Sequence, residues 1–337
     1  MQREQSALRT GMMVLVCALA IRLIGVVAPP IAKFLAKPEN ASFLVFLETG
    51  RVIKPTITPS HTEPAETTPP ETIQVSTEPT KTEEEPLQFF PEDAELIQIR
   101  NTSGAQVDLE TLLLTPWQMN AVPESPLVLI VHSHGTESYT QTEAAPYTPS
   151  GDFRTLDSAN NMLRVGEALK KALEARGISV IHDRTLHDYP SYNDAYSNSR
   201  KSVTDYLKEY PSLCIVIDLH RDATDTAAEQ LKTAITIRGD EYARLMLVIG
   251  TNRTGGGNSW QDNMALAVKL QVRLEQKYPG ICRPISLRKE RFNQDLSTGA
   301  LLIEVGSAGD TLEQALSAAE ALADCLGEIL LKKCSTS

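Results

Sequence analysis

Histidines and carboxylates follow several apolar segments of this 337-residue chain, at a spacing that suits metal binding. In HSHGTESY (residues 132–139), His134 and Glu137 are separated by two residues, and a turn through Gly135 lets both side chains approach one ion. His220 ends a second apolar segment, LCIVIDLH. Two histidines and one carboxylate are a donor set that zinc accepts, and they leave a fourth position open, as catalytic zinc sites do. The residue types therefore predict a hydrolytic zinc site.

Glu304 is the candidate catalytic residue, because it interrupts the otherwise apolar segment LLIEVG. A carboxylate there is costly unless it is paired or associated with a metal. Beside a metal, such a group takes a proton from the attacking water and returns it to the leaving amine. We therefore expect Glu304 to act as the general base.

The third metal ligand has a second candidate in Asp157, which precedes a predicted helix over residues 158–177. Asp157 is also a suitable residue to cap that helix together with Ser158, and capping is the simpler interpretation. The sequence thus predicts Glu137 as the ligand and keeps Asp157 as the alternative.

Three further polar residues have weaker assignments. Arg221 and Asp222 directly follow His220, so they could orient that histidine, bind a substrate carboxylate or form a structural salt bridge. We expect His132 to point to the opposite face of the sheet from His134.

These residues need a scaffold that brings distant segments together, and the chain after Ile97 alternates between strand-like and helix-like segments. Strands are predicted over residues 127–134, 178–183, 213–220, 233–239, 244–250 and 300–307, and helices over 158–177, 197–210, 264–278 and 311–332. This alternation predicts one α/β domain over residues 96–337, with a mostly parallel sheet and helices on both faces. Ligands of such sheets bind beyond the carboxyl ends of the strands, where the candidate residues fall.

Residues 1–95 have a different character. Residues 11–28 are apolar except for Arg22 and would extend about 27 Å as a helix, which is close to the thickness of a bilayer core. We expect a single transmembrane anchor within residues 1–32, with the remainder exported, and keep a cleaved signal peptide as the alternative. Residues 33–95 are rich in Pro, Thr and Glu and predict a disordered, extended linker.

Charge and cysteine content exclude other classes. The net charge of −11 is concentrated in residues 62–95, which hold ten acidic residues and one lysine. No basic excess remains to bind nucleic acid. The five cysteines include no CxxC pair, which excludes a zinc ribbon and a disulfide scaffold.

Five segments together resemble the stage II sporulation protein P family, whose members are peptidoglycan hydrolases of endospore-forming bacteria. The segments are HSHGTESY, RVGEALKKALEARGISVIHDRT, SYNDAYSNSR, IDLHRD and LLIEVGSAGDTLEQA, in this order over residues 132–315. The resemblance implies a domain related to zinc N-acetylmuramoyl-L-alanine amidases, with His134 and His220 as ligands and Glu304 as the catalytic glutamate. Those amidases take their second ligand from a glutamate near the first helix, where this chain has Asp157. Zinc carboxypeptidases of similar fold use HxxE instead, which favours Glu137.

The resemblance also implies a function. It predicts cleavage of the amide bond between N-acetylmuramic acid and L-alanine, together with hydrolysis of peptide cross-links, in septal wall thinning and engulfment during sporulation. It further implies stage II sporulation proteins D and M as partners, and a single-pass membrane protein with an extracytoplasmic catalytic domain. The alternatives are a zinc carboxypeptidase, which would need an arginine clamp such as Arg221 or Arg238, and a catalytically silent wall-binding module.

Overall fold

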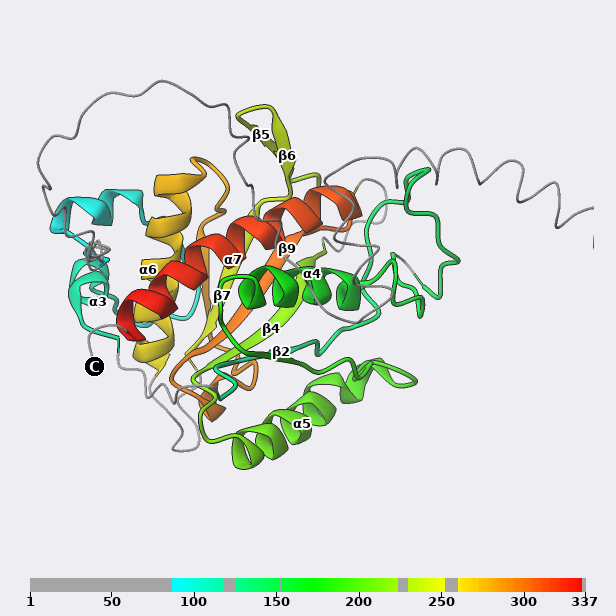
Figure 1. Cartoon of the computed structure of the whole chain (residues 1–337), viewed down its shortest axis with the longest axis horizontal. Helices are drawn as coiled ribbons and strands as arrows, with labels where there is room; N and C mark the ends of the chain where they lie inside the picture. Colours follow the sequence, from blue (N-terminus) through cyan, green and yellow to red (C-terminus); the bar gives the residue numbers. More distant parts are fainter. Residues whose placement is uncertain (1–86, 118–124, 152, 224–229, 252–259, 335–337) are drawn as a thin grey trace, which may run out of the picture. The chain divides into compact units, whose positions relative to one another are not determined.

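The computed structural model describes residues 87–117, 125–151, 153–223, 230–251 and 260–334 (Figure 1). The expected anchor and nearly all of the expected linker lie outside these residues. Within the described ranges, no helix has the length and apolar character needed to cross a bilayer.

A seven-stranded sheet forms the centre of the described part of the chain, in the order β1-β8-β7-β9-β4-β2-β3. The strands are β1 (Ile99–Asn101), β2 (Val128–Val131), β3 (Val180–His182), β4 (Ile215–Asp222), β7 (Leu245–Gly250), β8 (Ile285–Arg288) and β9 (Ala300–Ser307). Neighbouring strands are parallel everywhere except between β7 and β9. The predicted mostly parallel sheet is confirmed.

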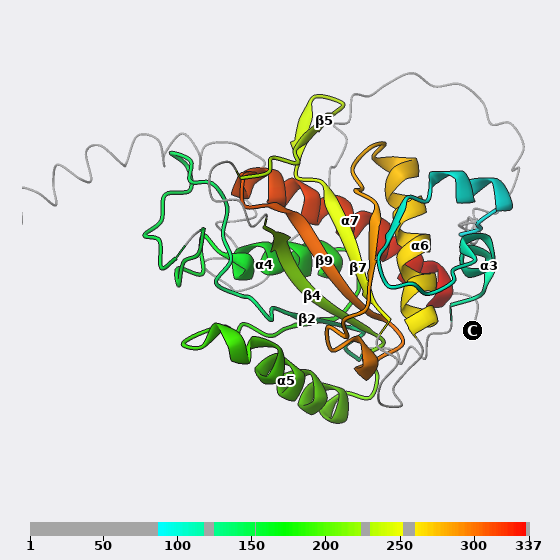
Figure 2. The same cartoon turned by 180° about the vertical axis from the view of Figure 1, so that it is seen from behind.

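Helices cover both faces of this sheet (Figures 1 and 2). They are α3 (Leu109–Leu114), α4 (Met162–Glu174), α5 (Ala195–Glu209), α6 (Trp260–Lys277) and α7 (Leu312–Cys334). Leu129 and Val131 of β2 pack with Val203 of α5, whereas Ile130 packs into the larger cluster that β2 shares with α4, α6 and α7. A strand buried on both faces needs consecutive apolar residues, which explains the unbroken apolar run in β2.

Helix α4 forms where the amphipathic pattern predicts a helix, but it begins at Met162 instead of residue 158. Its apolar stripe is buried, including Val165 and Leu169. The helix is capped by Asn161, whose side chain accepts a hydrogen bond from the backbone N–H of Leu163 at 3.0 Å. Gly177 follows the helix with φ of +84°, a conformation that glycine adopts without strain.

Three features differ from the sequence-based expectation. Residues 233–239 do not extend the main sheet, because β5 (Ile235–Ile237) folds back on β6 (Asp240–Tyr242) as an antiparallel hairpin. Strands β1 and β8 were not predicted and have only three and four residues. Phe89 packs against the core and Pro91–Leu96 form a 3-10 helix, so ordered structure begins before residue 96.

Candidate functional site

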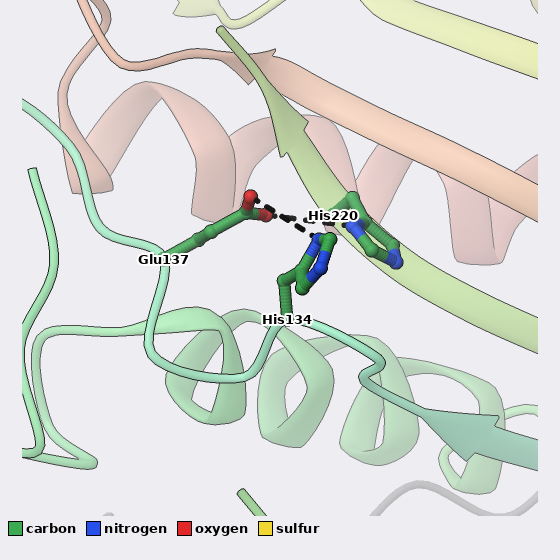
Figure 3. Close-up of side chains that lie close together, drawn as sticks. All are labelled: His134, Glu137 and His220. Carbon is green, nitrogen blue, oxygen red and sulfur yellow. Dashed lines mark ion pairs between the residues drawn. The ribbon is translucent and has the colours of Figure 1, made fainter. Parts of the chain in front are cut away.

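His134, Glu137 and His220 meet beyond the carboxyl end of β2 and beside β4 (Figure 3). One possible ligand atom from each residue lies within 4.8 Å of the others. Glu137 Oε1 is 3.7 Å from His134 Nδ1, and Glu137 Oε2 is 3.5 Å from His220 Nδ1. The side chains of His134, Glu137 and His220 are 12%, 6% and 4% exposed, respectively. The structure therefore brings together the three residues that the sequence predicted, in a site largely withdrawn from water.

Asp218 fixes the orientation of His220. Both residues lie in β4 two positions apart, and His220 Nε2 is 2.8 Å from Asp218 Oδ1. Asp218 also accepts hydrogen bonds from the backbone N–H and the hydroxyl of Ser133, at 2.7 and 2.6 Å. Burial opposes the charged form of His220, yet the carboxylates of Asp218 and Glu137 raise its pKa well above the ordinary value. Because Nε2 of His220 is bonded to Asp218, the other ring nitrogen, Nδ1, faces the site. Metal-binding histidines are commonly oriented in this way by a carboxylate on their second nitrogen.

Glu137 is held as a carboxylate. Burial raises its pKa, but the positive charges of Arg221 and the two histidines outweigh burial and bring the pKa well below the ordinary value. The backbone N–H of Arg221 donates to Oε2 at 3.2 Å, and the guanidinium of Arg154 lies 3.4 Å from Oε1. An ionised, oriented carboxylate is the form that a metal ion requires.

Glu304 of β9 lies beside His220 of the neighbouring strand β4, because these two residues are partners in the register of the two strands. Its Oε2 is buried and has no hydrogen-bond partner within the described part of the chain. Burial raises the pKa of Glu304 to about 8; the charge of His220 opposes this change and that of Glu137 adds to it. Glu304 does not belong to the compact His134, Glu137 and His220 group, so its position suits proton transfer better than ligation.

Asp157 is not brought to the site. It is exposed, and its carboxylate accepts hydrogen bonds from the backbone N–H of Ala159 at 2.9 Å and the side-chain amide of Asn160 at 2.8 Å. The expectation that Asp157 caps the helix is also wrong, because Asn161 takes that position. Asp157 instead stabilises the turn that precedes the cap.

Arg221 and Asp222 have structural partners. Arg221 is buried, and its guanidinium donates to the backbone carbonyls of Ser138 and Phe153, both at 3.0 Å. Asp222 forms an ion pair with Arg283 at 2.8 Å. The predicted alternative of a structural salt bridge thus fits Asp222, and Arg221 Nη1 lies 3.8 Å from Glu137 Oε1. Because the Arg221 guanidinium already donates to backbone carbonyls of the loops around Glu137, it is poorly placed to bind a substrate carboxylate.

Two tyrosines of the SYNDAYSNSR segment line the site and were not predicted from the sequence. The ring of Tyr192 stacks on His134 with 4.5 Å between centroids and 10° between planes. Tyr196 meets His134 edge-on at 5.4 Å and lies 6.4 Å from the ring of His220. Tyr192 begins the 3-10 helix Tyr192–Asp194 that leads into α5, and Tyr196 lies in the first turn of α5; their spacing of four residues is the signal that could have placed both on one side.

The donor set fits a zinc ion on chemical grounds. Two imidazoles and a carboxylate are the ligands of many hydrolytic zinc sites, and such ions hold three protein ligands with one position open. The unpartnered buried oxygen of Glu304 is a second indication, because a buried polar atom normally has a partner.

These observations define an α/β domain with a candidate metal centre at the carboxyl ends of its strands. The chain belongs to the stage II sporulation protein P family, whose model matches residues 37–327, so the predicted family is confirmed. The stage II sporulation protein P of Bacillus subtilis (strain 168) is 32% identical over 216 residues, which cover 60% of this chain and 51% of that protein. The chain therefore spans about half the length of this curated relative.

Two solved structures show a more distant likeness. The CwlD amidase of Clostridioides difficile, solved in complex with the GerS lipoprotein, is 14% identical, with a TM-score of 0.40 over 63% of this chain and 100% of that chain. The catalytic domain of CwlV, an N-acetylmuramoyl-L-alanine amidase from Bacillus (Paenibacillus) polymyxa var. colistinus, is 14% identical, with a TM-score of 0.36 over 63% of this chain and 99% of that chain.

Proposed function

We propose that this chain is a zinc-dependent peptidoglycan hydrolase that cleaves the amide bond between N-acetylmuramic acid and L-alanine. The observation that carries the proposal is the convergence of His134, Glu137 and His220 beside the unpartnered carboxyl of Glu304. Membership of the stage II sporulation protein P family supports a wall substrate and a role in sporulation.

The residues have distinct roles in this proposal. His134, Glu137 and His220 would hold the ion, and zinc, when bound, polarises the scissile carbonyl and makes the attacking water more acidic. Glu304 accepts a proton from this water at Oε2 and passes it to the nitrogen of the leaving L-alanine. Burial raises the pKa of the metal-free Glu304 carboxyl, and the positive charge of a bound ion would favour the ionised form that accepts a proton. Asp218 keeps the His220 ring in place throughout.

The broader proposal is hydrolysis of peptide cross-links in the same site, since one ligand set is present within the described residues. We further propose that the protein acts in septal wall thinning and engulfment, with stage II sporulation proteins D and M as partners. Residues 1–32 would anchor it in the cell membrane, with the catalytic domain in the extracytoplasmic space between the septal membranes. These points rest on the family and on the composition of residues 1–95.

Product analysis tests the proposed bond specificity. The purified chain is incubated with isolated sacculi, and the soluble products are identified by mass spectrometry. Wild type should release stem peptides with a free L-alanine amino terminus. Glu304→Gln should lower that rate by about 100-fold or more while keeping zinc, because general acid–base groups contribute about 10²- to 10⁴-fold.

Exposed Glu290 provides the matched control, and Glu290→Gln should react at the wild-type rate. Release by Glu304→Gln at near wild-type rate would show that Glu304 is a structural carboxylate. Release of carboxyl-terminal amino acids alone would favour a carboxypeptidase, and no product from a zinc-loaded wild-type protein would favour a silent binding module.

A further inference from the structure

Tyr192 presents an exposed aromatic ring directly beside the candidate metal ligands. The residue is 53% exposed although its ring stacks on His134. The guanidinium carbon of Arg154 lies 4.7 Å from the centre of the same ring. A partly exposed aromatic ring at the edge of a site presents an apolar body and a polar tip to a ligand.

The segment that carries Tyr192 is fixed by buried polar contacts. Asp188 has a fully buried side chain that pairs with Arg154 Nη1 at 2.9 Å and accepts hydrogen bonds from Thr136. The side-chain amide of Asn198 donates to the backbone carbonyl of His187 at 2.9 Å. These contacts tie the segment to the turn that carries the ligands and to α5. The ring is therefore held in place before a substrate binds, which reduces the entropic cost of binding.

The surroundings of the ring narrow the chemistry of its ligand. The charge of Arg154 is already shared between Glu137 and Asp188, so little of it remains to attract an anion. What remains exposed of the Tyr192 ring, beyond its contacts with His134 and Arg154, is an apolar surface with a polar edge. A pyranose ring matches this surface, because its C–H groups form an apolar face while its hydroxyl groups remain in water.

We propose that Tyr192 stacks on a sugar ring of the glycan strand and so forms an amino-sugar subsite beside the metal centre. This inference rests on the proposed function, in which the scissile bond has N-acetylmuramic acid on one side and L-alanine on the other. Alanine has only a methyl group to place against an aromatic ring, whereas the sugar has a full face.

Binding of peptide-free glycan strands to the metal-free protein tests the subsite independently of catalysis. The probes are oligosaccharides of alternating N-acetylglucosamine and N-acetylmuramic acid, measured by calorimetry against the full chain after treatment with a chelator. Tyr192→Ala and Tyr192→Leu should each lower the affinity by roughly 2- to 10-fold, the range expected for loss of one aromatic stacking contact. Tyr192→Phe should bind as wild type does. Tyr189→Ala is the matched control, because Tyr189 is 57% exposed in the same segment and should not change binding.

Three results would overturn the subsite: unchanged glycan affinity in Tyr192→Ala, full affinity in Tyr192→Leu, or a loss seen only with a sugar-free stem peptide as the probe. Circular dichroism of each variant confirms that it is folded. The outcome is separable from the proposed hydrolysis. If wild type cleaves no amide bond but glycan binding depends on the ring of Tyr192, the hydrolase proposal fails and the subsite stands. If cleavage proceeds and glycan binding ignores Tyr192, the subsite alone fails.

Discussion

The raised pKa of Glu304 predicts that this residue makes the metal-free protein less stable as the pH rises. In the unfolded chain the carboxyl ionises near 4.5, whereas in the folded protein burial holds its pKa at about 8. Between these two values the unfolded state loses a proton that the folded state keeps, so the free energy of unfolding falls with increasing pH. Above about pH 8 both states are ionised and the loss levels off.

The size of this effect follows from the two pKa values. Each pKa unit corresponds to about 1.4 kcal/mol, so a carboxyl held at about 8 instead of 4.5 would cost about 5 kcal/mol when ionised. The Oε2 atom of Glu304 is buried, but the residue as a whole is partly exposed, so solvent screening reduces the expected loss to about 3 kcal/mol. Glu304→Gln removes the ionisation and keeps the shape. We therefore expect the variant to gain about 3 kcal/mol over wild type between pH 4.5 and pH 8.5.

Urea unfolding of chelator-treated protein measures this difference. Fluorescence of Trp117 reports the transition, because its indole is buried in the core and donates a hydrogen bond to the backbone carbonyl of Thr298. Groups that do not interact with Glu304 affect both proteins alike, so the difference between variant and wild type reports on Glu304 together with its coupling to His220 and Glu137. A difference that stays constant from pH 4.5 to 8.5 would refute the reasoning, because it would mean that Glu304 ionises equally easily in both states.

The remaining predictions concern the ligands and their support. Glu137→Ala should lower zinc affinity by about 10-fold or more, measured by competition with a chromophoric chelator. Asp157→Ala should leave the affinity unchanged, because Asp157 is exposed and lies outside the ligand group; the reverse pattern would transfer the ligand role to Asp157. Asp218→Asn should weaken zinc binding by about 10- to 100-fold in the same assay, because it loosens the His220 ring, and an unchanged affinity would show that the ring is fixed by other contacts. Gly166→Ala should destabilise the fold by about 1–3 kcal/mol in urea unfolding, because a Cβ there would lie 2.6 Å from the Nε2 atoms of His132 and His182. Gly151→Ala is the control, since a Cβ at that position meets no atom closer than 3.7 Å. Equal stability of the two variants would contradict this packing argument.

The sequence predicted the elements whose patterns are long and regular. The unbroken apolar run of β2, the apolar stripe of α4 and the single glutamate within the apolar strand β9 each carry a signal that follows from one element alone. Strands β1 and β8 have three and four residues and no clear period, so they are defined only by pairing with each other and with β7. The hairpin of β5 and β6 depends on the turn at Arg238 and Gly239, both with positive φ, which an apolar pattern does not reveal.

The candidate site divides in the same way. His134, Glu137, His220 and Glu304 could be found because their positions at strand ends bring them together once the sheet is parallel. Arg154 could not be found, since it lies in a loop without periodicity and reaches Glu137 only through the folded arrangement of that loop. Asp218 was not predicted but could have been, because its spacing of two residues from His220 places both side chains on one face of β4.

The three residues His132, Ser133 and His134 show how one strand end can build the site from both faces of the sheet. His134 is a candidate ligand, and Ser133 binds the carboxylate that orients His220. His132 Nδ1 lies 3.0 Å from the backbone carbonyl of Leu219, and because a carbonyl only accepts, this nitrogen must carry the proton. His132 Nε2 then accepts from His182 Nε2, 2.9 Å away, which connects the same strand end to β3. Residues two apart would share a face within a strand, but β2 ends at Val131, so the turn that follows lets His134 enter the site while His132 contacts β3 and β4 behind it.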